Sequence, residues 1–75
     1  MKKLIDYDGT IKGYKIGAYY LLKRYTFKNY YSWIITQNID DANLMSCEFD
    51  KKVNNKEIEI VNNFKEGKKT LLERI

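Results

Sequence analysis

Two aspartates near the start of the chain have the types and spacing that could support chemistry. Asp6 and Asp8 follow the apolar pair Leu4-Ile5 and precede Gly9, so two carboxylates stand beside a glycine. Calcium loops begin in this way, but they also need a bidentate glutamate at the twelfth position. Gly17 occupies that position, and the third acid of such a loop is missing. The sequence therefore argues against a calcium loop.

The seven residues 4–10, LIDYDGT, resemble the first motif of haloacid-dehalogenase-type phosphotransferases, an apolar strand followed by DxDGT. The resemblance implies that Asp6 is the nucleophile, that Asp8 is the general acid and base, and that Mg²⁺ binds between them. That family uses a doubly wound α/β domain roughly twice this length or more. Asp8-Gly9 also suits the positive φ of a tight hairpin turn. We expect this second role, with no cofactor or metal.

Few other reactive groups are available. The chain has one cysteine and no histidine, so Cys47 lacks an imidazole to activate it, and a zinc site is disfavoured. Cys47 falls on the inward positions of an alternating segment, which predicts a buried, inert thiol. The sequence contains no glycine-rich phosphate loop and no serine triad. We therefore expect a protein that is not an enzyme.

Aromatic and basic residues are concentrated in residues 14–37, which hold eight of the eleven aromatic residues, four basic residues and no acid. Rings give nucleobases a surface for stacking, and cations follow phosphates. Tyrosine and tryptophan are also typical of protein–protein hot spots. A small domain needs some of these rings for its core, but it cannot bury all eight. The stretch predicts an interface and leaves the class of partner open.

Length and charge set further limits. The 75 residues predict a single domain, 1–75. Residues 1–39 carry seven Lys/Arg and two Asp, a net charge of +5, whereas residues 40–75 carry seven Lys/Arg and eight Asp/Glu, a net charge of −1. A single cysteine fits a reducing cytoplasm. No apolar run approaches the roughly 20 residues that span a membrane, and no signal peptide is predicted.

Turn residues and alternating hydrophobicity predict a chain rich in β-strands. We expect strands over residues 3–7, 10–16, 18–27, 30–38, 45–53 and 57–61, with turns at Asp8-Gly9, Lys28-Asn29 and Asn54-Asn55. A short helix follows, capped by Asn62 or Asn63, and its predicted apolar stripe consists of Phe64, Leu71, Leu72 and Ile75. The predicted fold class is α+β: a small antiparallel β-sheet or open barrel of five to six strands with one C-terminal helix.

The strand predicted over residues 18–27 places alternate residues on opposite faces. We assign to the core the face that carries Tyr19, Leu21, Lys23, Tyr25 and Phe27. The other face carries two cations and Thr26, so we assign it to solvent. With contributions from neighbouring strands, the predicted partner-binding residues are Lys15, Tyr20, Arg24, Lys28 and Tyr30.

Two functions fit these expectations. The first is a small non-enzymatic inhibitor or regulator of a protein or nucleoprotein complex. Phages and mobile elements use such single-domain blockers against host nucleic-acid-processing or defence machinery, as anti-CRISPR proteins do. The second is a module that binds nucleic acid directly through an aromatic-basic β surface. Direct binding of nucleic acid weakens steeply with salt, so salt dependence separates the two.

Overall fold

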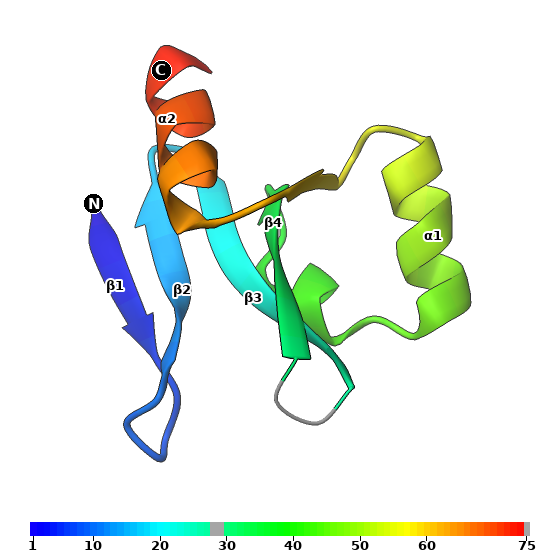
Figure 1. Ribbon diagram of the computed structural model, residues 1–75, viewed down its shortest axis with the longest axis horizontal. Helices are drawn as coiled ribbons and strands as arrows, with labels where there is room; N and C mark the ends of the chain where they lie inside the picture. The colour runs from blue at the N-terminus through cyan, green and yellow to red at the C-terminus, as the bar shows by residue number, and fades with distance from the viewer. Residues whose placement is uncertain (28–29, 75) are drawn as a thin grey trace.

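The computed structural model describes residues 1–27 and 30–74, and within them five strands form one antiparallel sheet. The elements are, in chain order, β1 (Lys2–Ile5), β2 (Ile11–Ile16), β3 (Tyr19–Phe27), β4 (Tyr30–Thr36), the 3₁₀ helix η1 (Ile39–Asn43), α1 (Ser46–Asn54), β5 (Glu59–Val61) and α2 (Phe64–Arg74). The strands lie in the sheet in chain order, from β1 to β5 (Figure 1). The predicted α+β class, with an open antiparallel sheet and a C-terminal helix, is confirmed. In the described part of the chain, no helix combines the length and apolar character needed to span a membrane.

The Asp8-Gly9 turn between β1 and β2 forms as predicted. Gly9 has a φ of 85°, and its amide donates to the carbonyl of Asp6 at 2.9 Å. The Thr10 amide donates to Oδ1 of Asp8 at 3.0 Å, and this bond lowers the pKa of the exposed Asp8 carboxylate. Asp8 therefore stabilises a hairpin. The described strands pair antiparallel, which differs from the doubly wound sheet that the phosphotransferase resemblance implies.

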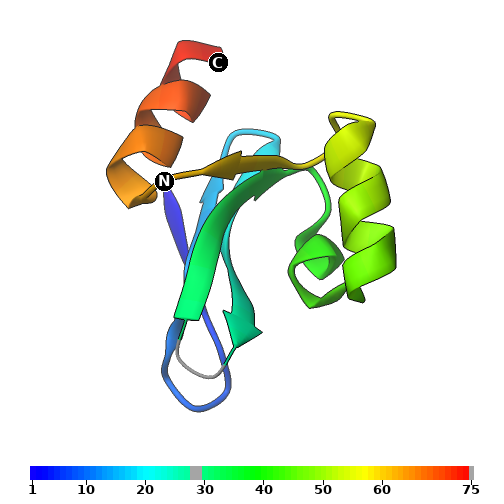
Figure 2. The same ribbon diagram turned by 45° about the vertical axis from the view of Figure 1, so that its right-hand side comes forward.

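Both faces of the sheet carry apolar side chains, because Leu21 and Leu22 on β3, and Ile34 and Ile35 on β4, alternate between the two faces. The cluster on one face, which we call the α2 face, contains Ile16, Leu21, Ile35, Val61 and Leu71. The cluster on the opposite face, the α1 face, contains Leu22, Ile34, Phe49 and Ile58. Figure 2 shows α2 on one side of the sheet and α1 with η1 on the other. The sheet is the middle layer of three.

The α2 helix begins as predicted and packs closely on the sheet. The amide of Glu66 donates to Oδ1 of Asn63 at 2.8 Å, so Asn63 caps the helix. Gly67 is buried, and a Cβ there would lie 2.5 Å from Cδ1 of Leu21. Glycine thus lets the helix approach β3.

The predicted apolar stripe of α2 is partly wrong, because Leu72 is 52% exposed and does not belong to it. Ile75, the last residue of that stripe, lies outside the described residues. The predicted turn at 28–29 lies outside them as well.

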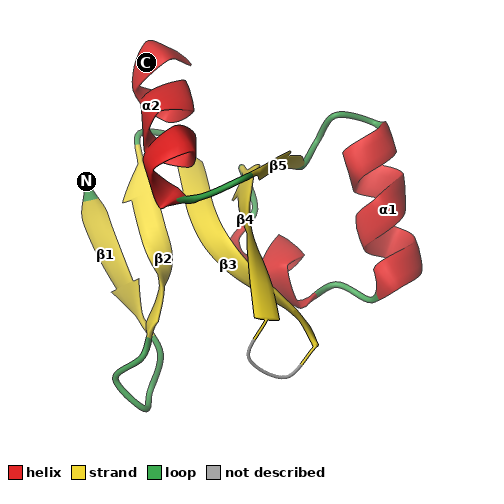
Figure 3. Cartoon of the chain, in the orientation of Figure 1, coloured by secondary structure: helices red, strands yellow, loops and turns green. Residues whose placement is uncertain are grey.

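The strand predicted over residues 45–53 is wrong, because Ser46–Asn54 form α1 (Figure 3). Phe49 and Val53 fit an alternating pattern, but they are also four residues apart and so share one side of a helix. Both side chains join the α1-face cluster, whereas Met45 is 75% exposed. Glu48 in the first turn and lysines in the last complement the helix dipole.

The burial predicted for Cys47 is wrong for the same reason. The residue lies in the first turn of α1 and is exposed. We expect a thiol reagent to label native Cys47 stoichiometrically within minutes, and Cys47→Ser to change the free energy of unfolding by less than about 0.5 kcal/mol. Measuring labelling in native and denaturing buffer would check this. Labelling that requires denaturant would show that the thiol is covered.

Candidate functional site

Among the described residues, five aromatic side chains form a continuous row on the α2 face. Ring centroids lie 5.3 Å apart between Tyr25 and Tyr31, and 5.9 Å apart between Tyr31 and Trp33. The ring of Trp33 lies 5.5 Å from Phe64 of α2 and 6.5 Å from Tyr14 of β2. The register produces this row, because Tyr25 pairs with Tyr31 directly across β3 and β4. The row therefore runs from the core outward along the sheet.

The outer end of the row is exposed to solvent. Tyr25 is 51% exposed and Tyr31 is 43% exposed, whereas Trp33 is half-buried against the α2-face cluster. The helix α2 lies over one end of this face, and the other ends of β3 and β4 extend beyond it (Figure 2). The exposed rings thus stand on two paired strands, which set their spacing.

Two lysines accompany the rings. Nζ of Lys23 lies 4.9 Å from the ring centroid of Tyr31 and 5.7 Å from that of Trp33. Lys12 lies two residues before Tyr14 on β2, so the two side chains share the α2 face. Lys12, Lys23 and Tyr25 also line a small cavity of about 100 Å³ together with Asp6 and with Ala42 and Asn43 of η1. Neither lysine forms an ion pair in the described part of the chain. We call Lys12, Lys23, Tyr25, Tyr31 and Trp33 the aromatic–basic surface.

The predicted partner-binding residues are divided between separate places. Lys15 is exposed, and its Nζ lies 5.6 Å from the ring centroid of Tyr20, which packs against the α1-face cluster. Tyr20 pairs with Thr36 at the end of β4, whereas Tyr30 begins that strand and is 72% exposed. Lys28 lies outside the described residues.

Arg24 does not point into solvent as predicted. Its guanidinium donates to the carbonyl oxygens of Leu44 at 2.7 Å and Ala42 at 3.3 Å, and it lies 3.9 Å from the ring centroid of Phe49. The prediction is wrong because it assumed that one face of β3 is open. In the structure η1 and α1 cover that face, and Arg24 joins them to the sheet.

Because Arg24 holds three contacts between β3 and the η1–α1 segment, Arg24→Leu is expected to lower the free energy of unfolding by about 2 kcal/mol. Urea denaturation followed by circular dichroism would measure the loss. Lys15→Leu on the neighbouring strand is a suitable control and should change stability by less than about 0.5 kcal/mol. Equal stability of the two variants would show that the Arg24 contacts contribute nothing.

In the described residues, no group of three or more His, Cys, Asp or Glu side chains is placed to hold a metal ion. No family model, no curated protein and no solved structure matches this chain.

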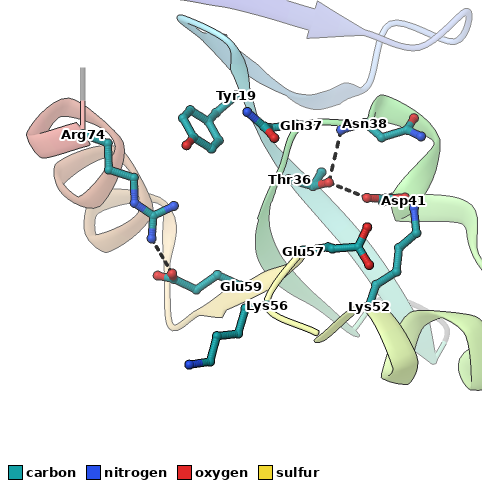
Figure 4. Close-up of a pocket in the computed structure, with 10 residues that line it drawn as sticks. All are labelled: Tyr19, Thr36, Gln37, Asn38, Asp41, Lys52, Lys56, Glu57, Glu59 and Arg74. Atoms are coloured by element: carbon teal, nitrogen blue, oxygen red, sulfur yellow. Dashed lines mark hydrogen bonds and ion pairs between the residues drawn. The ribbon is translucent and has the colours of Figure 1, made fainter. Parts of the chain in front are cut away.

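A polar groove of about 680 Å³ lies at the other end of β4 (Figure 4). At its floor the Thr36 hydroxyl donates to the buried carboxylate of Asp41, and Nζ of Lys52 lies 2.7 Å from the other Asp41 oxygen. Arg74 of α2 pairs with Glu59 of β5 at 2.5 Å. The first set of contacts links β4, η1 and α1, and the Arg74–Glu59 pair links α2 to β5, so both have a structural role. No role for Asp41 or Lys52 is predicted from the sequence, because nothing in the sequence pairs the two residues.

The ion pair at this groove changes the titration of its lysine. The hydrogen bond to Asp41 raises the pKa of Lys52 above its ordinary value, and partial burial opposes the rise. The ammonium of Lys52 is therefore charged throughout the neutral range.

Proposed function

We propose that this protein is a non-enzymatic binding module that regulates or blocks a macromolecular partner through the aromatic–basic surface. The observation that supports this most is the exposure of Tyr25 and Tyr31 beside lysines that form no ion pair within the described part of the chain. Burial of apolar surface stabilises a protein by about 25 cal/mol for every Å² removed from water, and an exposed ring lacks this stabilisation. Rings held exposed at fixed spacing are therefore typical of an interface.

A narrower form of the proposal is an inhibitor like those that phages and mobile elements direct against host nucleic-acid-processing or defence complexes in the cytoplasm. It is supported by the small size and net charge of +4 and by the exposed tyrosines. In this form the rings bury in a pocket of the partner, and the lysines meet its acidic residues or phosphates.

The test is capture of a partner from host lysate by tagged protein, with and without nuclease. The double variant Tyr25→Ala/Tyr31→Ala should reduce capture at least about tenfold, because both residues lie in the proposed contact. Tyr7→Ala is the matched control, since Tyr7 is fully exposed in the β1–β2 turn. Equal capture by all three proteins, with unchanged melting temperatures, would contradict the proposed surface.

A further inference from the structure

We propose that the aromatic–basic surface binds single-stranded nucleic acid. Bases stack on the exposed rings of Tyr25 and Tyr31, and phosphates contact Lys12 and Lys23. This inference rests on the proposed function and names the chemical class of its partner.

The charges of the surface favour an anionic partner. Lys12 and Lys23 are half-buried, yet in the described part of the chain neither is paired with a carboxylate. The ammonium of Lys23 is instead placed against the rings of Tyr31 and Trp33. Asp6 lines the same small cavity as both lysines but forms no ion pair with either of them in the described part of the chain. The surface therefore keeps positive charge available next to ring faces.

The arrangement of rings and cations matches the repeat of a nucleotide chain. Each nucleotide offers a flat base and an anionic phosphate, and proteins bind such chains with rings for the bases and cations for the backbone. Tyr25 and Tyr31 come from adjacent strands with their centroids 5.3 Å apart, and Nζ of Lys23 lies 4.9 Å from the second ring. Once Lys23 turns from the face of Tyr31 toward a phosphate, that ring face and the ammonium group together are complementary to one such unit.

A single strand fits better than a duplex. In a duplex the bases cover one another, so rings on a sheet cannot reach their faces. A duplex is usually entered by a helix or a β-ribbon that places polar side chains in a groove. The helices described here carry both signs of charge, with Glu48, Asp50 and Lys51 exposed on α1 and Lys65, Glu66 and Lys69 exposed on α2.

Binding would alter the surroundings of Trp33, which is the only tryptophan in the chain. A phosphate would draw the Lys23 ammonium away from the rings, and a base would take its place against Tyr31. Because Trp33 lies between these groups and the core, its fluorescence reports occupancy of this surface without a label.

The experiment combines Trp33 fluorescence with anisotropy of a fluorescein-labelled oligothymidylate of about 12 nucleotides, within the 4–16 that one small domain contacts. Lys12→Gln/Lys23→Gln should weaken binding at least about tenfold at about 50 mM salt. It should also flatten the slope of log K against log salt by about 1.4, which corresponds to two phosphate contacts. Tyr25→Ala should weaken binding roughly fivefold or more.

The matched control is Lys15→Gln/Lys51→Gln, which has the same net charge but removes two exposed cations from other parts of the molecule. It should bind within about threefold of wild type. Equal weakening by the two double variants would overturn the inference, because binding would then follow net charge alone. So would a duplex of the same length that binds as tightly as the single strand.

Failure of this inference can be told apart from failure of the proposed function. If the oligonucleotide does not bind, but Tyr25→Ala/Tyr31→Ala still loses a partner captured after nuclease treatment, the partner is a protein. The inference is then wrong and the proposed function stands. If neither the oligonucleotide nor a lysate partner depends on these residues, both are wrong.

Discussion

Gly13→Ala is expected to lower the free energy of unfolding by about 3 kcal/mol or more. A Cβ at residue 13 would lie 2.4 Å from the carbonyl oxygen of Leu21 and 2.9 Å from Cα of Leu22. Both are backbone atoms of β3, which is hydrogen-bonded to β2 on one side and β4 on the other. The clash cannot be relieved by a rotamer change. For a chain of this length, such a loss is a large part of the roughly 4–11 kcal/mol that stabilises it.

Gly9→Ala is the control for this prediction. Gly9 has a φ of 85°, but a Cβ there would have no atom within 4 Å. Its cost is the left-handed backbone alone, about 1 kcal/mol. Urea denaturation of both variants would separate the two effects. A Gly13→Ala variant as stable as Gly9→Ala would show that β2 and β3 can separate locally at little cost.

Lys52→Met is expected to lower the free energy of unfolding more than Asp41→Asn does. Adding Asp41→Asn to Lys52→Met should restore part of the stability that Lys52→Met removes. Asp41 is 2% exposed and has two described partners, Thr36 and Lys52. Without Lys52 the carboxylate stays buried and charged, which is the costly case. In Asp41→Asn the amide can still accept from Thr36, and Lys52 reaches water, so the loss is about 1–2 kcal/mol.

Chemical denaturation of the two single variants and the double variant tests this coupling. A double variant less stable than Lys52→Met would contradict it. The wild type should also lose stability at alkaline pH. Because the folded-state pKa of Lys52 is raised above 10.5, its contribution is complete below that value and is lost as pH rises through the folded pKa. The Lys52→Met variant should therefore lose less stability than the wild type as the pH rises above 10.5.

Much of the sheet could be predicted from local pattern. The strands β1 to β4, β5 and the Asn63 cap all lie where alternation, turn residues and capping residues indicated. The exception is α1, where Phe49 and Val53 satisfy both a period of two and a spacing of four. Only the tertiary environment decides between them, because η1 and α1 are needed to cover Leu22 and Ile34.

The site was only partly predictable. Residues 14–37 are rich in rings and cations, but the side of β3 that stays exposed depends on where the helices lie. Since α2 covers one end of its face, Tyr25 remains in solvent, whereas η1 and α1 enclose Arg24. A local pattern assigns residues to two faces and contains no information about which helix covers each face.

The order of strands in the sheet also has an entropic consequence. Neighbours β2 and β3 are joined through Gly17 and Ala18 alone, so their pairing closes a very short loop. The pairing of β4 with β5 closes a loop of residues 37–58. By the logarithmic dependence on loop length, this costs about 2 kcal/mol more. Burial of Ile58 and Val61 offsets that cost, and η1 and α1 shorten the flexible part of the loop. The edge strand β5 therefore depends on the helices before it, whereas the β2–β3 hairpin depends on its own turn.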